Sequence, residues 1–310
     1  MKTDNKIQAM GLVMLAVLMA STQDMIVKSV SGVYPAYQMV MFRCVVSMPI
    51  LGVWLAMRGG LKTLLTPYLP VILLRSAVLC SAYFAYILSL ASMAMANTVS
   101  IYFTLPLFVA ALSGWGLGEK VPAHRWIAII AGFIGVLIMV RPDTGHFPPG
   151  SILALYSAFA YAVGQMMGRS LSQKVDTLVI SNWQNFIYLA FALGLWGAIS
   201  VLGLGNSESK TLAFLTRPPS WPISDHYAVL LSMGFLAAVS MMAYVNAYRS
   251  APANFVAPFE YSAMIWAVLY GFIIFHDLPD KWTLVGAAIV VGAGLYMLRR
   301  DQIMARQTTG

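Results

Sequence analysis

Long apolar runs recur along this 310-residue chain, and short polar or Gly/Pro-containing connectors separate them. The hydrocarbon core of a bilayer is about 30 Å thick, so a helix needs about 20 predominantly apolar residues to cross it. The runs have approximately this length. Only 10% of the residues are charged, whereas soluble domains carry about 25%. The chain is therefore predicted to be an all-α membrane protein.

On this length scale the sequence predicts ten membrane-spanning helices. The predicted spans are 8–28, 34–57, 69–91, 96–118, 122–140, 149–169, 176–203, 226–248, 253–275 and 281–299. The first run follows Lys2 and Lys6, as the apolar part of a signal peptide would. Because nine further runs come after it, we interpret it as the first span.

Basic residues lie mainly in the connectors on one side of the predicted bundle. With the N-terminus inside, twelve Lys and Arg residues fall on the cytoplasmic side and five on the outer side. Cytoplasmic loops carry such an excess of Lys and Arg. The bias predicts a multi-pass protein of the bacterial cytoplasmic (inner) membrane with both termini in the cytoplasm. It also explains the net charge of +8 without a nucleic-acid partner, which would require a clustered basic face.

The two halves of the chain share a weak internal repeat. Equivalent positions include 96–97 and 253–254, 24 and 165, 28 and 169, and 141–143 and 299–301. Residues 1–143 and 144–310 are therefore predicted to be two five-helix repeats. An odd number of spans per repeat inverts the second repeat relative to the first. Secondary transporters commonly have this arrangement, with the substrate site near the membrane midplane.

Two long stretches carry a family resemblance. The first is TVSIYFTLPLFVAALSGWGLGEKVPAHRWIAIIAGFIGVLIMVRPD at 98–143, and its counterpart occupies 251–301. The first has a proline within the fourth span, a Gly-Glu pair that closes it, and a tryptophan before a glycine-rich fifth span. The second has His276-Asp277 in place of Gly-Glu. Together they resemble the EamA-type branch of the drug/metabolite transporter superfamily, over essentially the whole chain.

The stretch MASTQDMIVKSVSGVYPAYQMVMFRCVV at 19–46 narrows the resemblance. It is similar to bacterial importers of riboflavin and of S-adenosylmethionine. The resemblance implies a ten-helix transporter whose central cavity is lined mainly by spans 1, 3, 4, 6, 8 and 9. Riboflavin uptake is the first substrate prediction. The alternatives are transport of S-adenosylmethionine or an amino-acid-like metabolite, and export of a metabolite or metallophore.

A carboxylate lies inside the ninth predicted span, two residues after a proline. A charge at the centre of a spanning helix costs about 2.5–3.5 kcal/mol on insertion scales. Pro258 cannot donate a backbone hydrogen bond and breaks the helix, as Pro106 does in the fourth span. Glu260 and Tyr261 are therefore predicted to face a hydrated cavity, as substrate-binding or proton-coupling residues. The alternative is that Glu260 only bonds to a neighbouring helix.

Aromatic side chains recur in the helices predicted to line the cavity. A pocket with aromatic faces and a few hydrogen-bonding groups suits a flat, polar heterocycle. The further residues predicted for this pocket are Asn246, Tyr86, Tyr102 and Tyr161.

Polar residues near the two ends of the cavity are predicted to form gates. Asp24 and Lys28 lie one helical turn apart and can pair with each other, while Arg43 enters from the next span. They are interpreted as an outer gate or as a structural ion pair. Gln165 and Arg169 occupy the equivalent positions of the second repeat and predict a matching inner gate, to which Asn185 is assigned as well. Arg169 alone is equally explained as an interfacial positive-inside residue.

Other polar residues and the glycines have simpler interpretations. Arg75 is expected to extend to the inner surface. Asp277 is expected to be a helix-end residue in water, beside Lys281. The glycines of the fifth and tenth spans are predicted to permit close helix packing. They are Gly132, Gly135, Gly286, Gly292 and Gly294.

Enzyme and channel functions are disfavoured by what the sequence contains. There is no H-E-x-x-H motif, no Ser–His or Ser–Lys dyad, and no pair of intramembrane aspartates. We therefore predict no catalytic residues, no metal, no cofactor and no ATP-binding site. Channels usually build rings of like residues from symmetric subunits, unlike two halves with different polar sets. The predicted partners are a small-molecule solute and the lipid bilayer, and the protein is expected to be a monomer or a weak homodimer.

Overall fold

The computed structural model describes residues 6–58, 60–116, 122–140, 149–171, 173–203, 210–221, 226–251, 256, 259–277 and 279–308. Within these ranges the regular secondary structure is entirely helical. The helices are α1 (Lys6–Val30), α2 (Ala36–Arg58), the 3-10 helix η1 (Leu61–Leu64), α3 (Leu69–Ser92), α4 (Met95–Tyr102), α5 (Leu105–Gly116), α6 (Ala123–Val140), α7 (Pro149–Leu171), α8 (Thr177–Leu202), α9 (Lys210–Thr216), α10 (Tyr227–Ser250), α12 (Ala263–Phe275) and α13 (Lys281–Thr308). The prediction of an all-α protein is confirmed.

Seven segments of the described chain are long and apolar enough to cross a membrane. They are α1, α2, α3, Met95–Leu112 across α4 and α5, Pro149–Gly168 in α7, α8 and α10. The predicted spans 122–140, 253–275 and 281–299 coincide with three shorter apolar helices, Ala123–Met139, Ala263–Phe275 and Lys281–Met297. The protein is therefore a multi-pass membrane protein, and helix length alone accounts for seven of the ten predicted spans.

Local sequence signals explain several helix boundaries. The Asp176 carboxylate caps α8 by accepting a hydrogen bond from the Leu178 amide at 2.8 Å. Gly203 ends the same helix at φ 63°, a left-handed conformation that glycine adopts without strain. The two short helices η1 and α9 lie in connectors and were not predicted.

The fourth predicted span is broken, as Pro106 suggests. The chain leaves the helix at Phe103 and Thr104, between α4 and α5. Pro106 is the second residue of α5, where a missing N–H does not remove a helical hydrogen bond. Pro258 lies outside the described residues. Beyond it, the backbone is helical at Phe259 and Glu260 and makes a turn before α12 begins.

The helix contacts follow a two-fold pattern. By chain order α1 corresponds to α7, α2 to α8, α3 to α10 and α6 to α13. Exchanging the two halves turns the α1–α10 contact into the α7–α3 contact, and both contacts are present. It also turns the α2–α10 contact into the α8–α3 contact, and again both are present. The pairs α2–α8 and α6–α13 map onto themselves. The two halves are therefore built and packed alike.

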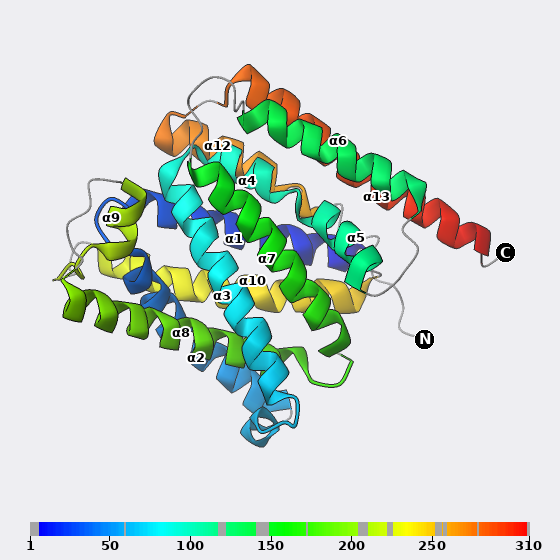
Figure 1. The fold of residues 1–310 in the computed structure, drawn as a ribbon. Coiled ribbons are helices and arrows are strands. Elements are labelled where there is room, and N and C mark those ends of the chain that lie inside the picture. Colours follow the sequence, from blue (N-terminus) through cyan, green and yellow to red (C-terminus); the bar gives the residue numbers. More distant parts are fainter. Residues whose placement is uncertain are drawn as a thin grey trace.

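Helices α6 and α13 lie side by side along one edge of the molecule (Figure 1). They cross through facing glycines. A Cβ atom built on Gly135 would lie 2.8 Å from the Gly286 carbonyl oxygen, and one on Gly286 would lie 2.5 Å from the Gly135 carbonyl oxygen. A Cβ on Gly132 or Gly294 would meet a Leu107 or Tyr261 side chain, so close packing is seen at these positions too. The packing prediction is wrong for Gly292, where a Cβ would meet nothing within 4 Å.

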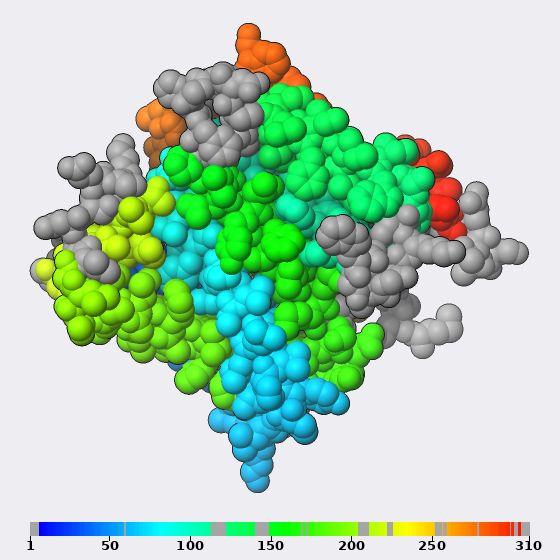
Figure 2. Space-filling model, viewed as in Figure 1, coloured from blue at the N-terminus to red at the C-terminus, as the bar shows by residue number. Residues whose placement is uncertain are grey.

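Much of the outer surface is apolar. Figure 2 shows the face on which α3 and α7 meet, and exposed side chains of these helices include Leu74 and Phe159. Along α6, Ile127, Ile130 and Leu137 are each more than half exposed. A soluble protein rarely exposes apolar surface on this scale, whereas lipid tails cover it in a membrane.

Candidate functional site

A cavity of about 400 Å³ lies between the two halves. Its wall comes from α1, α2, α3, α4, α5, α7, α8 and α10, from Glu260 and Tyr261, and from the start of α12. The charged residues that line it are Asp24, Arg43 and Glu260, the polar ones are Ser21, Gln23, Ser157, Gln184 and Ser240, and the aromatic ones are Tyr83, Tyr86, Tyr102, Phe103, Tyr161, Tyr188, Tyr244 and Tyr261. The site is therefore an aromatic pocket with three charged groups.

The structure brings most of the predicted site residues to this one cavity. Glu260, Tyr261, Tyr86, Tyr102, Tyr161, Asp24, Arg43 and Pro106 all line it. The rings form a connected wall: the centroids of Tyr86 and Tyr102 are 5.0 Å apart, and those of Tyr102 and Tyr161 are 5.9 Å apart. Such spacings are normal for interacting aromatic rings.

Four predicted residues lie outside the cavity lining or have side chains that are not described. Asn246 does not line the cavity, and its backbone carbonyl accepts a hydrogen bond from Ser250 Oγ at 2.8 Å. Gln165 of α7 is exposed and does not line the cavity, so its assignment to an inner gate stays a prediction. The side chain of Arg169 lies outside the described residues. Asn185, the third inner-gate residue, is buried against α2, where Ser47 Oγ donates to its Oδ1 at 3.1 Å.

Glu260 reaches both the cavity and a neighbouring helix. Its Oε1 accepts a hydrogen bond from the Tyr248 hydroxyl on α10. The carboxylate is thus tied to α10 while it also lines the cavity. This position is compatible with both roles predicted for Glu260, namely a substrate-binding or proton-coupling group and a bond to a neighbouring helix.

Asp24 and Arg43 face the same cavity without forming an ion pair. Asp24 Oδ2 accepts a hydrogen bond from the Tyr86 hydroxyl at 2.7 Å. The Arg43 guanidinium carbon lies 4.7 Å from the ring centroid of Tyr83 and 5.6 Å from that of Tyr188. The Lys28–Asp277 ion pair involves neither Asp24 nor Arg43. The predicted pairing of Asp24 with Arg43 is therefore not seen in this structure.

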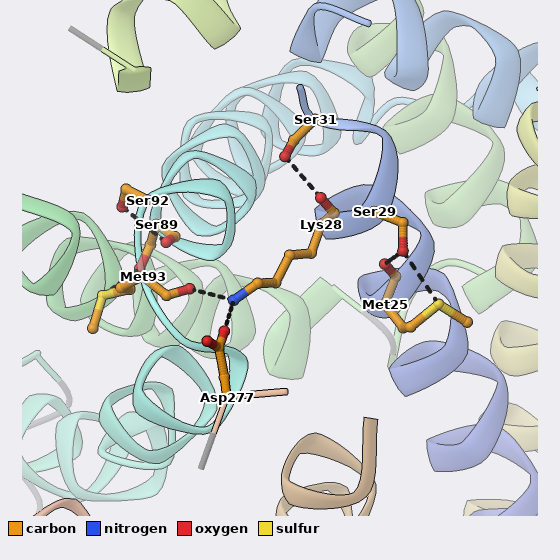
Figure 3. A network of polar contacts seen from close by, with 8 residues as sticks. All are labelled: Met25, Lys28, Ser29, Ser31, Ser89, Ser92, Met93 and Asp277. Carbon is orange, nitrogen blue, oxygen red and sulfur yellow. Dashed lines mark hydrogen bonds and ion pairs between the residues drawn. The ribbon is translucent and has the colours of Figure 1, made fainter. Parts of the chain in front are cut away.

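Lys28 pairs with Asp277 rather than with Asp24. Its Nζ lies 3.1 Å from Asp277 Oδ2 and donates to the Met93 carbonyl oxygen at 2.9 Å (Figure 3). The contact joins the end of α1 to the residues that follow α3 and α12. Asp277 was predicted to stand in water beside Lys281, and its side chain is 45% exposed, so that prediction missed only its partner.

Arg75 turns inward instead of extending to the membrane surface. Its Nε donates to the Gly164 carbonyl oxygen at 3.0 Å, and its Nη1 donates to Gln184 Oε1 at 3.1 Å. The expected extension toward the interface is therefore wrong. The reason is the packing of α3 against α7 and α8, where the Gly164 carbonyl oxygen of α7 and the Gln184 side-chain amide of α8 accept hydrogen bonds from the guanidinium.

Sequence reasoning missed Gln23, Gln184 and Tyr188 in the cavity wall. The ring planes of Tyr83 and Tyr188 are nearly parallel, 21° apart with centroids 5.5 Å apart. Gln23 donates to the Tyr83 hydroxyl at 3.1 Å. Gln184 and Tyr188 lie one helical turn apart on α8, and their polar groups could have been read as one face of that span. The predicted lining comprised spans 1, 3, 4, 6, 8 and 9, whereas α8, the seventh span, also lines the cavity.

A metal centre finds no support in the described residues, because no three His, Cys, Asp or Glu side chains gather there. Cys44 and Cys80 are buried and unpaired with each other, as small packing residues would be. What the cavity offers chemically is aromatic surface, hydrogen-bonding groups and separated charges. These are means of binding a solute.

Known proteins provide an independent comparison. The model of the EamA-like transporter family matches residues 7–141 and 148–299. A protein of Brucella anthropi named riboflavin transporter is 25% identical over 277 residues, which cover 89% of this chain and 91% of that protein. A protein of Rickettsia conorii named S-adenosylmethionine uptake transporter is 24% identical over 294 residues, which cover 94% of this chain and 92% of that protein.

A solved structure shares the fold. It is a crystal structure with a TM-score of 0.60 and 19% sequence identity, and the match covers 97% of this chain and 99% of the other. The arrangement of helices is therefore one that an experimental structure also has, over nearly the full length of both chains.

Proposed function

This chain belongs to the EamA-like transporter family, and on that basis we propose that it carries a flat, polar metabolite across the bacterial cytoplasmic membrane. The observation that supports this cargo is the aromatic cavity of about 400 Å³ between the halves. Pockets of this size with aromatic faces and a few polar groups suit small heterocyclic ligands. The residues proposed to bind substrate or a coupling proton are Glu260, Tyr261, Tyr86, Tyr102 and Tyr161.

Two solutes are the leading candidates. Riboflavin has the flat ring that the tyrosine wall suits, and a similar protein carries its name. S-adenosylmethionine is the alternative, because it combines a flat adenine with charged groups and the cavity holds three charged side chains. A third candidate activity is export of a similar metabolite, which differs from the first two in the direction of transport and not in the chemistry of the solute.

We further propose that the chain crosses the membrane ten times, as two inverted five-helix halves comprising residues 1–143 and 144–310. Seven crossings would place the two ends of the chain on opposite sides. Instead α1 begins and α13 ends on the same side of the molecule (Figure 1). Adding the three shorter apolar helices to the seven long segments gives an even number. The excess of Lys and Arg in the connectors on that side supports cytoplasmic termini.

In mechanism, the halves are proposed to rock about the cavity, so that it opens first to one side and then to the other. The break at Phe103 and Thr104 and the turn after Glu260 supply bendable walls on opposite halves. The Lys28–Asp277 contact lies at the end of α1 away from the termini. We propose that it holds the outer mouth closed and is released when the cavity opens outward.

The Lys28–Asp277 gate gives a charge-swap prediction. An ion pair of partly exposed groups contributes about 0.2–1 kcal/mol. Losing this ion pair should shift the ratio of the inward-open to the outward-open state by up to about fivefold, which is the shift that about 1 kcal/mol produces. Lys28→Asp and Asp277→Lys should each change the rate of solute counterflow in proteoliposomes by that factor. The double swap should restore it.

Lys281→Met is the matched control for this gate. Lys281 lies at the start of α13, where its Nζ is 5.6 Å from the Trp282 ring centroid, and it takes no part in the Lys28–Asp277 pair. Its substitution should leave counterflow unchanged. A double swap that stays as impaired as the single variants would remove the ion pair from the gate.

The proposed function is tested by transport itself. Purified protein is reconstituted into liposomes, and uptake of labelled riboflavin and of labelled S-adenosylmethionine is followed in both directions. Saturable movement of either solute supports the proposal, and its direction separates import from export. The same measurement in auxotrophic cells checks uptake in a living membrane. Failure of folded, correctly inserted protein to move either solute would contradict it.

A further inference from the structure

Arg43 is the cationic group of the cavity, and part of its hydrogen-bonding capacity is unused. It lies in the middle of α2 and lines the cavity wall. Its Nε and Nη1 atoms are buried and have no hydrogen-bond partner within the described chain. A guanidinium removed from water without partners is costly inside a membrane protein. Its presence calls for a binding partner that the protein itself does not supply.

The position of the Arg43 guanidinium is fixed from two sides. The rings of Tyr83 and Tyr188 lie 4.7 Å and 5.6 Å from its central carbon. Arginine stacks on aromatic faces in this way and keeps its fork of N–H groups free. Its backbone is held against α10, since a Cβ atom on Gly234 would lie 2.6 Å from the Arg43 carbonyl oxygen. The group is thus preorganised to receive a ligand.

The nearby polar groups are engaged with other partners. Asp24 Oδ2 accepts from the Tyr86 hydroxyl, and the Tyr83 hydroxyl accepts from Gln23. The Tyr188 hydroxyl donates to the Leu79 carbonyl oxygen at 2.9 Å. In the part of the chain that the structure describes, no ion pair connects Arg43 to a carboxylate. A purely structural salt bridge therefore does not explain this arginine.

We propose that the Arg43 guanidinium is the subsite for a carboxylate group of the transported solute, a proposal that rests on the function proposed above. A planar guanidinium binds a carboxylate through two parallel hydrogen bonds. Asp24 and Glu260 line the same cavity and repel a highly charged anion, while they attract a cation. The set therefore fits a zwitterion, in which a carboxylate meets Arg43 and a cationic group meets Asp24 or Glu260. Of the two leading solutes, S-adenosylmethionine has this charge pattern and riboflavin does not.

Binding measurements on purified, lipid-reconstituted protein test the subsite. S-adenosylmethionine is compared with decarboxylated S-adenosylmethionine, which lacks only the carboxylate. Riboflavin is compared with riboflavin 5′-phosphate, which adds an anionic phosphate to the same ring. Each ligand is titrated against the parent protein, Arg43→Gln and Arg43→Lys. Size-exclusion profiles and unliganded melting temperatures show whether each variant is folded.

The parent should bind S-adenosylmethionine more tightly than its decarboxylated form. Arg43→Gln should weaken S-adenosylmethionine binding by about 10- to 100-fold, as expected for losing hydrogen bonds between charged groups. It should leave the decarboxylated ligand unchanged, so that the preference disappears. Arg43→Lys should restore part of it, because it keeps the charge without the planar fork. If Arg43→Gln does not fold, Arg43→Lys alone should show a reduced preference.

Several outcomes would overturn the subsite. They are equal binding of both ligands by the parent, equal weakening of both in the variants, and tightest binding of riboflavin 5′-phosphate, which would make the site a phosphate site. Transport is measured in parallel, so that the two proposals fail separately. A protein that binds S-adenosylmethionine through Arg43 but moves no solute contradicts the transport function alone. One that moves solute with no dependence on Arg43 contradicts the subsite alone.

Discussion

Glu260→Gln is expected to reduce transport to about one-tenth of the parent rate or less, since a hydrogen bond to a charged group contributes about 1.5–3 kcal/mol. Glutamine has nearly the same shape as glutamate and retains an oxygen that can accept from the Tyr248 hydroxyl, so the contact with α10 survives. Only the negative charge and the ability to take up a proton are lost. Initial uptake rates in proteoliposomes measure the effect.

Tyr248→Phe is the complementary variant. It removes the hydrogen bond to Glu260 and keeps the carboxylate in the cavity wall. We expect transport to persist in Tyr248→Phe and to fail in Glu260→Gln. The reverse result would mean that Glu260 serves only to tie two helices together.

The step at which Glu260→Gln fails separates its two possible roles. Loss of equilibrium solute binding identifies the carboxylate as a substrate contact. Retained binding and exchange, with loss of accumulation driven by a proton gradient, identifies it as the proton-coupling group. A variant that accumulates solute as the parent does would exclude Glu260 from the mechanism.

Gly135→Ala is expected to have the second large effect, on stability. The added Cβ would lie 2.8 Å from the Gly286 carbonyl oxygen, closer than carbon and oxygen normally approach. Because the obstacle is backbone, α6 and α13 must move apart. Overpacking of this kind costs about 1–3 kcal/mol. The apparent melting temperature in detergent should fall by roughly 2–12 °C, given about 2–4 °C per kcal/mol for chains of about 150–250 residues.

Gly292→Ala is the matched control on α13. A Cβ at this position meets nothing within 4 Å, and alanine is a better helix former than glycine. Its melting temperature should be equal to that of the parent or slightly higher. Gly286→Ala should behave like Gly135→Ala. Equal melting temperatures for all three variants would show that the α6–α13 crossing does not depend on these glycines.

The fold was predictable from the sequence to the extent that it depends on local pattern. Apolar run length located the helices, Asp176 and Gly203 mark the ends of α8, and Pro106 marked the break between α4 and α5. These features are set by residues within a few positions of one another. Short connector helices such as η1 and α9 are set by packing against distant segments, and they were missed.

The sequence predicted which residues line the site better than it predicted which side chains contact one another. Glu260 and Asp24 could be identified because a carboxylate inside an apolar spanning helix is costly unless it faces a cavity or a partner. The partner of Lys28 could not, because Asp277 is 249 positions away and only the fold brings them together. The exposed position of Gln165 could not be predicted for a related reason. Equivalence to Asp24 in the repeat fixes its height along the helix but not whether that face of α7 points inward.

The exchange of contacts between the halves has an energetic consequence. If α1 on α10 and α3 on α7 are the same interface built twice, opening one side of the cavity and closing the other trades one copy for the other. The interior packing then contributes nearly equally to both states, and their relative populations are decided by the few residues that differ between the copies. Asp24 is such a residue, because its equivalent in the second repeat is the uncharged Gln165. A mutation at Asp24 is therefore expected to change the relative populations of the two states more than the overall stability of the fold.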